Sequence, residues 1–362
     1  MAMARATTTT IALKQIKNTN SNHKKSSSDN KNEEYILLPG LPNHLAQLCL
    51  SPLHPSLLYT VCRSWRRLIY SPSFPPFFSL YALLSPRSPR PSNSIEFFSL
   101  DPVSSTWTPL PSPSSPLHLL HRHPSFISRT LPIQSVAVSG RLVLIAATNP
   151  HFLPALSHPL VFDPLSTSKR WFSGPPLPTP RRWCAAGSVG GAVYVASGIG
   201  SCYHSDMARS VEKWEVDKKD KEWIWEEMAA LKDGRGRLQR SEKPVGGNAE
   251  GDAGWVERAG GGCRHFGPRG GEMFVVDEEK GTVSKYDADN DRWEEVVESL
   301  EILKGAEQIA AGRGRVCVIC GSGGRIVVVD VAARPPRTWV VNPPPEMEVV
   351  SLHILPRMSL PE

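Results

Sequence analysis

Residues 36–77 have the hydrophobic spacing of helices, whereas the chain beyond them has the spacing of strands. Leu45, Leu48 and Cys49 recur at intervals of three and four residues, which places them on one helix face. A second stripe follows, formed by Leu57, Leu58, Val61, Cys62, Trp65, Leu68 and Ile69. Ser71-Pro72 ends it, because a residue before proline avoids the helical conformation. The region predicts two short helices, which are too small to form a stable domain alone.

Beyond Phe78 a sequence pattern that predicts short strands repeats along the chain. Each copy has a strand of small residues, a glycine turn, a β-branched strand, a strand that ends in Asp, and a later Trp. The copies are Ser135–Ala146 with Leu160–Asp163 and Trp171; Ala185–Gly198 with Val211–Asp217 and Trp223; Gly271–Asp277 with Val283–Asp287 and Trp293; and Gln308–Gly321 with Ile326–Asp330 and Trp339. Repetition at about fifty residues, with four strands per unit, is typical of a mostly β protein of the propeller type. We expect each Asp to accept backbone hydrogen bonds in the next turn and each Trp to fill the wedge between blades.

A fifth blade must be assembled from both ends of this region. Phe78–Leu84 and Ile95–Asp101, followed by Trp107, supply three of its strands, but no local segment supplies the first strand. Val349–Leu355 has the right character for it. We therefore expect the ring to close by pairing the last strand with the first blade.

Residues 232–271 do not fit the repeat. They are rich in Gly and Arg, and they contain no convincing strand, since Val245, Trp255 and Phe266 stand isolated. Loops of this length are uncommon in compact domains. Two interpretations remain open: a long insertion in a five-bladed propeller, or a degraded sixth blade, for instance through a gene-model or reading-frame error.

The helical region resembles an F-box, most specifically in the closing run Val61–Ile69. It departs from that family at Asn43-His44, where F-boxes often carry acidic residues. F-boxes bind the Skp adaptor of cullin-based SCF ubiquitin ligases through apolar helix faces. The resemblance implies adaptor contacts at Leu41, Pro42, Leu45, Leu58 and Val61. Trp65 and Leu68 are expected to hold the helices together instead.

The region from Phe78 to Arg357 resembles kelch repeats, so residues 78–357 are expected to form a kelch-type β-propeller behind an F-box at 36–77. This combination resembles plant F-box/kelch-repeat proteins that interact with Skp-like adaptors. It implies a non-catalytic substrate-recognition subunit of an SCF-type E3 ubiquitin ligase, without a cofactor. The expected partners are a Skp-type adaptor, cullin through that adaptor, and an unidentified protein target held near the ligase. A kelch scaffold without a ubiquitin role and a propeller enzyme remain as alternatives.

Loops that join strands carry recognition more often than blades do. Arg181 and Arg182, together with Tyr203 and His204 in the loop from Gly198 to Met207, are therefore the candidates for contacting the target.

Composition limits the ligands and the cellular compartment that we expect for the protein. Residues 1–34 are polar and predict a disordered tail, although a transit peptide is an alternative reading. The net charge of +6 is spread along the chain, which argues against nucleic-acid binding. No apolar run reaches the roughly 18 residues that span a membrane. The odd number of cysteines and the absence of a secretory signal indicate a reducing compartment, and we expect the nucleus, the cytoplasm or both.

The sequence holds no recognisable catalytic motif. It lacks the phosphate-binding loop, the HExxH zinc helix and the GxSxG nucleophile elbow. Cys317 and Cys320 form a C-x-x-C, but no second ligand pair stands at a suitable spacing for zinc, and their neighbours indicate a buried strand. His118, His121 and His123 cluster in a Pro/Ser-rich stretch that indicates a solvated loop. No metal site is expected.

Overall fold

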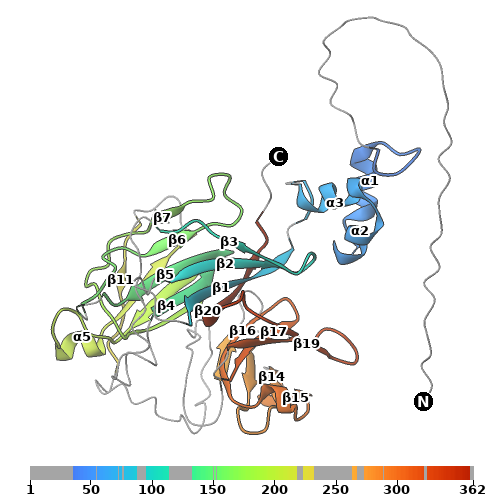
Figure 1. Cartoon of the computed structure of the whole chain (residues 1–362). Coiled ribbons are helices and arrows are strands. Elements are labelled where there is room, and N and C mark those ends of the chain that lie inside the picture. The colour runs from blue at the N-terminus through green and yellow to red at the C-terminus, as the bar shows by residue number, and fades with distance from the viewer. Residues whose placement is uncertain are drawn as a thin grey trace, which may run out of the picture.

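The computed structural model describes most of the chain from residue 36 onward. The described residues are 36–53, 55–71, 73–75, 77–87, 95–113, 133–149, 151, 153–217, 223–231, 263–266, 273–287, 289–321 and 324–358. The predicted tail at 1–34 and the cluster of His118, His121 and His123 lie outside them. A small helical module stands beside a larger body made of strands, as Figure 1 shows.

The helical module contains three helices rather than the two predicted. They are α1 (Asn43–Leu50), α2 (Pro55–Val61) and α3 (Arg63–Tyr70). The predicted second helix is divided because Cys62 adopts an extended conformation, with φ −156° and ψ 169°. The module has its own small core, formed by Leu37, Ala46, Leu50, Leu58, Leu68, Ile69 and Phe74. Trp65 packs against this core and donates from Nε1 to the Leu37 carbonyl at 2.7 Å, so Trp65 and Leu68 hold the helices together as expected.

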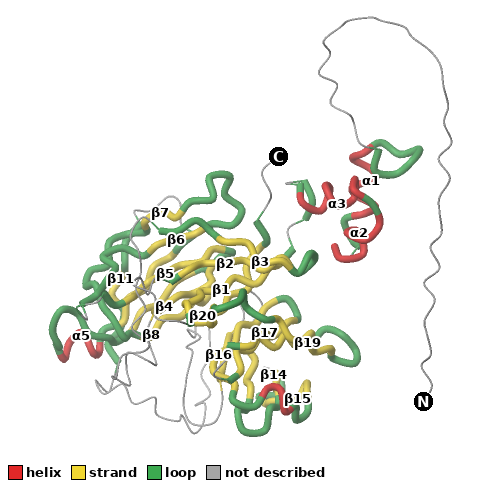
Figure 2. Tube along the Cα trace, in the orientation of Figure 1, coloured by secondary structure: helices red, strands yellow, loops and turns green. Residues whose placement is uncertain are grey.

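Within the described residues, the strands form five four-stranded antiparallel sheets, the blades of a β-propeller (Figures 1 and 2). The first consists of β20 (Met347–Pro356), β1 (Phe78–Pro86), β2 (Glu96–Asp101) and β3 (Thr106–Pro109). The second consists of β4 (Ile133–Val138), β5 (Arg141–Ala147), β6 (Leu160–Phe162) and β7 (Trp171–Ser173). The third consists of β8 (Ala185–Val189), β9 (Ala192–Ala196), β10 (Val211–Glu215) and β11 (Glu226–Glu227).

The remaining two blades lie toward the C-terminus. The fourth consists of β12 (Cys263–Phe266), β13 (Met273–Val276), β14 (Val283–Asp287) and β15 (Arg292–Val297). The fifth consists of β16 (Ala306–Gly312), β17 (Arg315–Cys320), β18 (Arg325–Asp330) and β19 (Arg337–Val341). Two short helical turns, α5 (Ser205–Arg209) and η1 (Glu301–Leu303), lie in connections between strands.

The ring closes as the sequence predicts. Strand β20 is the inner strand of the first blade and pairs with β1 from Phe78 opposite Pro356 to Pro86 opposite Met347. Tyr81 is fully buried at this junction and donates its hydroxyl to the Pro356 carbonyl at 2.8 Å. The first and last parts of the propeller are thus joined by a continuous ladder.

The fourth blade corrects one expectation. Cys263–Phe266 lies in the region from 232 to 271 that the sequence indicates to be without a strand, yet it forms β12 and pairs with β13. The remainder of that region lies outside the described residues, so the hypothesis of a degraded sixth blade stays a prediction.

The inner strands of the five blades follow one another around the ring. Strands β12, β16, β20, β4 and β8 lie against one another in that order.

Four of the repeated Asp residues act as the sequence predicts, whereas the turn after Asp217 lies outside the described residues. Asp101, Asp163, Asp287 and Asp330 each accept, through Oδ1, a hydrogen bond from the backbone N–H two residues later, at 2.9 to 3.2 Å. Each carboxylate therefore fixes the turn that leads to the outermost strand of its blade.

In three of the blades, a tryptophan ties the blade to its neighbour through a backbone carbonyl. The indole N–H groups of Trp107 and Trp171 donate to the carbonyls of Asn342 and Pro111, each in the chain that follows the outer strand of the adjacent blade. In the third blade this hydrogen bond is made by Trp225 rather than by the predicted Trp223, since Trp225 is buried and donates to the Pro175 carbonyl. Trp223 is 36% exposed and stacks on Phe172 of the second blade.

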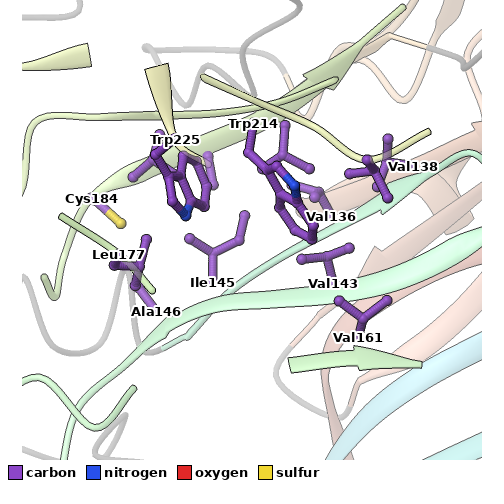
Figure 3. Close-up of a cluster of buried hydrophobic side chains, with 14 residues drawn as sticks. Val136, Val138, Val143, Ile145, Ala146, Val161, Leu177, Cys184, Trp214 and Trp225 are labelled. Atoms are coloured by element: carbon purple, nitrogen blue, oxygen red, sulfur yellow. The ribbon is translucent and has the colours of Figure 1, made fainter. Parts of the chain in front are cut away.

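The core consists of layers between blades. One layer joins the second blade to the third and contains Val143 and Ile145 from β5 together with Trp214 and Trp225 (Figure 3). Cys184 is buried in the same layer, and this burial raises the pKa of its thiol to about 12. Cys317 and Cys320 are also buried, in β17, as the sequence indicates.

Candidate functional site

The helical module exposes many large apolar side chains for its size. They lie before α1, along it, and through α2: Ile36, Leu41, Leu45, Leu48, Leu53, Leu57 and Val61, which are 41% to 69% exposed. We call them the helical apolar surface. Scattered exposed leucines are ordinary, whereas a concentration of them on one small module is typical of a surface for protein–protein contact.

Helix periodicity explains which side chains reach this surface. In α1, Ala46 and Leu50 are four residues apart and face the core, so Leu45 and Leu48 point outward. In α2, Leu58 is the buried residue, and its neighbour Leu57 is exposed. One set of leucines therefore forms the interior of the module, and another set is exposed to solvent.

The five predicted adaptor contacts divide accordingly. Leu41, Pro42, Leu45 and Val61 are exposed, so the structure leaves their side chains available to a partner. Leu58 is fully buried among the core residues of the module, which corrects its assignment as a contact. Leu48, Leu53 and Leu57 are exposed as well but were not among the predicted contacts, although the helical spacing placed Leu48 and Leu57 in the apolar stripes.

Charge on the module is of one sign. Residues 36–77 contain no Asp or Glu, and they contain Arg63, Arg66 and Arg67 in α3. Arg66 lies over the Tyr59 ring, with its guanidinium carbon 4.6 Å from the ring centroid, and donates to the Tyr59 carbonyl. The helical apolar surface is thus accompanied by positive charge, which favours a partner with acidic groups.

Three side chains fasten the module to the ring-closing blade. Tyr70 of α3 donates its hydroxyl to Asp101 Oδ2 at 2.9 Å, and Arg357 Nη2 lies 3.5 Å from the same oxygen. The Arg357 guanidinium also lies 3.8 Å from the centroid of the Tyr70 ring. Burial, followed by the hydrogen bond to Asp101, raises the pKa of Tyr70 above its usual range, so the phenol remains a donor. This junction sets the direction in which the helical apolar surface faces.

The predicted recognition residues of the propeller are not all at its surface. Arg181 is 1% exposed and forms an ion pair with buried Glu212, so its assignment as a target contact is wrong. Its Nη1 also donates at 3.0 Å to the Ser197 carbonyl and to Ser210 Oγ. A polar residue in a loop looks exposed in the sequence, because the sequence does not show a buried partner 31 residues away.

The other three candidates keep some access to solvent. Arg182 is half-buried over the Trp183 ring, and burial lowers its pKa from the ordinary arginine value. Tyr203 is 66% exposed, and His204 is exposed beside Cys202, with 3.0 Å between Sγ and Nε2. The third blade also exposes an apolar group that was not predicted, in which Trp223, Ile224 and Met228 are exposed and Trp223 stacks on Phe172.

Among the described residues, no group of three or more His, Cys, Asp or Glu side chains is placed to hold a metal ion. In the same part of the chain, no helix has the length and apolar character to cross a membrane.

Two curated proteins of Arabidopsis thaliana are similar to the chain, whereas no protein-family model matches it. The F-box/kelch-repeat protein SKIP25 is 44% identical over 91% of this chain and 92% of its own length. The F-box/kelch-repeat protein At1g16250 is 28% identical over 55% of this chain and 51% of its own length. The helical module, the five-bladed propeller and this similarity lead to one conclusion: the chain belongs to the plant F-box/kelch-repeat proteins.

Proposed function

We propose that the chain is the substrate-recognition subunit of an SCF-type E3 ubiquitin ligase. The F-box docks on a Skp-type adaptor, which connects it to cullin, and the propeller holds the protein target. The chain has no catalytic part in this scheme, because it acts by bringing the target close to the ubiquitin-transfer machinery.

The observation that carries this proposal is the helical apolar surface. Leu45, Leu57 and Val61 are 41%, 60% and 58% exposed on a module of only three short helices. Covering these side chains with a partner removes apolar area from water at about 25 cal/mol per Å². The positive charge of α3 complements an adaptor with an acidic surface.

The junction of Tyr70, Asp101 and Arg357 supports the second part of the proposal. A receptor subunit works only if the target faces the ubiquitin-transfer machinery, so the F-box and propeller need a fixed relation. The hydrogen bond and the ion pair at Asp101 connect the F-box to the first blade and support such a relation. We place the complex in the nucleus, the cytoplasm or both, and we propose no role in binding nucleic acid or membranes.

Reconstitution tests this function. The full chain, a Skp-type adaptor and a cullin are mixed, and size-exclusion chromatography shows whether they elute together. We expect a ternary complex with the wild-type chain and none with the double variant Leu45→Ser, Val61→Ser. Leu165→Ser is the matched control, because Leu165 is 51% exposed on the propeller. A folded wild-type chain that elutes apart from the adaptor would favour the alternative, a kelch scaffold without a ubiquitin role.

A further inference from the structure

A cavity of about 820 Å³ lies between the ring-closing blade and the blade formed by β16–β19. Strands β1, β2 and β20 line one side of it, and β17, β18 and β19 line the other. Sites for small molecules measure roughly 300 to 1,000 Å³. The cavity is therefore large enough for a ligand, and it is separate from the helical apolar surface.

The inner part of the cavity is apolar. Leu80, Leu100, Cys317 and Val328 line it, and all four belong to one buried core cluster. Burial raises the pKa of the Cys317 thiol to about 12, so this wall carries no charge near neutral pH. Such a lining favours a ligand with a compact apolar body.

Aromatic rings form the outer part. Trp107 from β3 and Trp339 from β19 both line the cavity, and Trp339 is 40% exposed where the cavity meets solvent. Indole faces pack well against a flat ring in offset or edge-to-face arrangements. An aromatic body is therefore the best complement to this opening.

The charged residues that line the cavity are two arginines and one aspartate. Arg315 Nε lies 3.9 Å from Asp330 Oδ2, so these two charges offset each other. Arg313 is exposed, and its guanidinium carbon lies 5.0 Å from the centroid of the Phe78 ring. Two positive charges against one negative leave a net charge of +1, which attracts an anionic group.

We propose that this cavity binds a small amphipathic molecule with an aromatic body and one anionic group. The body lies between Trp107 and Trp339 against Leu80 and Val328, and the anion faces Arg313. Pro55 of α2 also lines the cavity, so the bound ligand lies beside both the F-box and the propeller.

The test uses two fluorescent probes that differ in charge. The first is 1-anilinonaphthalene-8-sulfonate, an aromatic amphipath with one sulfonate, and the second is N-phenyl-1-naphthylamine, which lacks the sulfonate. Both are titrated into the full chain and followed by fluorescence. We expect saturable binding of both probes to the wild-type chain, with the sulfonate probe binding more tightly.

Two variants locate the site. In Gly312→Leu, the new side chain enters the cavity, since a Cβ there lies 3.5 Å from Ile354 Cγ2, an ordinary contact. We expect this variant to lose the saturable site for both probes. In Arg313→Gln, we expect the affinity for the sulfonate probe to fall about tenfold, while the affinity for the neutral probe stays unchanged.

Matched controls show whether a loss of binding is specific to substitutions in the cavity. Ala230→Leu and Arg325→Gln change exposed residues that do not line the cavity, and both keep wild-type binding. Arg313→Gln alters an exposed side chain, so it provides a test even if Gly312→Leu lowers stability. Wild-type binding of both probes to Gly312→Leu would overturn the proposal. Equal affinity of the sulfonate probe for Arg313→Gln and the wild-type chain would also overturn it.

Discussion

Removal of residues 351–362 deletes most of the strand that closes the ring. The truncation takes away Leu352 and Leu355, which are 2% and 1% exposed, and Pro356, whose carbonyl accepts the Tyr81 hydroxyl. Burying a leucine contributes about 1.5–3 kcal/mol, so the two leucines account for about 3–6 kcal/mol. Arg357, which joins the ring to the F-box, is lost as well. Native domains have unfolding free energies of about 5–15 kcal/mol, so we expect the truncated chain to lose its cooperative unfolding transition.

A point variant gives the same test with a smaller change. Leu355→Ala leaves a cavity in a core that includes Leu83, Leu142 and Leu144, and we expect a loss of about 2–5 kcal/mol. At about 2 °C per kcal/mol for a domain of this size, the Tm falls by about 4–10 °C. Leu165→Ala is the control, because Leu165 is 51% exposed and the same substitution there costs about 0.5 kcal/mol or less.

Near-ultraviolet circular dichroism during heating measures both effects, because it reports the packing of the aromatic side chains. A truncated chain that melts at the wild-type temperature would refute the closure of the ring by β20. Equal melting temperatures for Leu355→Ala and Leu165→Ala would refute it as well.

Three further predictions concern buried polar groups. Arg181→Met leaves Glu212 buried without its partner and lowers the free energy of unfolding, measured in urea, by about 3–5 kcal/mol. The double variant Arg181→Met, Glu212→Leu regains much of this stability. An equal loss of stability in the single and the double variant would contradict the ion pair. Burial, outweighing the effect of Arg181, raises the pKa of Glu212, so the folded chain binds more protons than the unfolded one above the usual glutamate pKa. Its contribution to stability therefore falls as pH rises above the usual glutamate pKa of about 4.3. Glu212→Gln removes this part of the pH dependence of urea unfolding, and identical pH profiles would exclude it. Iodoacetamide at about pH 8 modifies exposed Cys49 and spares Cys184 and Cys317 in the native chain, which peptide mass spectrometry checks. Rapid modification of either buried thiol would show that the structure around it opens.

Local features of the fold were predictable from the sequence. Asp101, Asp163, Asp287 and Asp330 end strands and accept the N–H two residues later, a bond that depends only on neighbouring residues. Closure of the ring was predictable because one blade lacked a strand and the C-terminus held a spare one. β12 was missed because Cys263–Phe266 has little apolar alternation, and its pairing with β13 defines it as a strand.

Features that depend on distant partners were not predictable. Arg181 and Glu212 lie 31 residues apart, and nothing in either segment reveals that they meet in the interior. Trp225 and Trp223 are two residues apart, so both point to the same side of an extended chain, and only packing against Pro175 selects one. At the site, apolar spacing identified the helices, but it did not separate buried Leu58 from exposed Leu57.

The affinity of the purified chain for a Skp-type adaptor, measured by isothermal titration calorimetry, tests the proposed docking most directly. The titration compares the wild-type chain with Leu45→Ala, Val61→Ala and the control Leu165→Ala. We expect tight binding by the wild-type chain and by the control, and a Kd raised about tenfold by each substitution on the F-box. Absence of binding by the folded wild-type chain, or an unchanged Kd in both F-box variants, would contradict docking through the helical apolar surface.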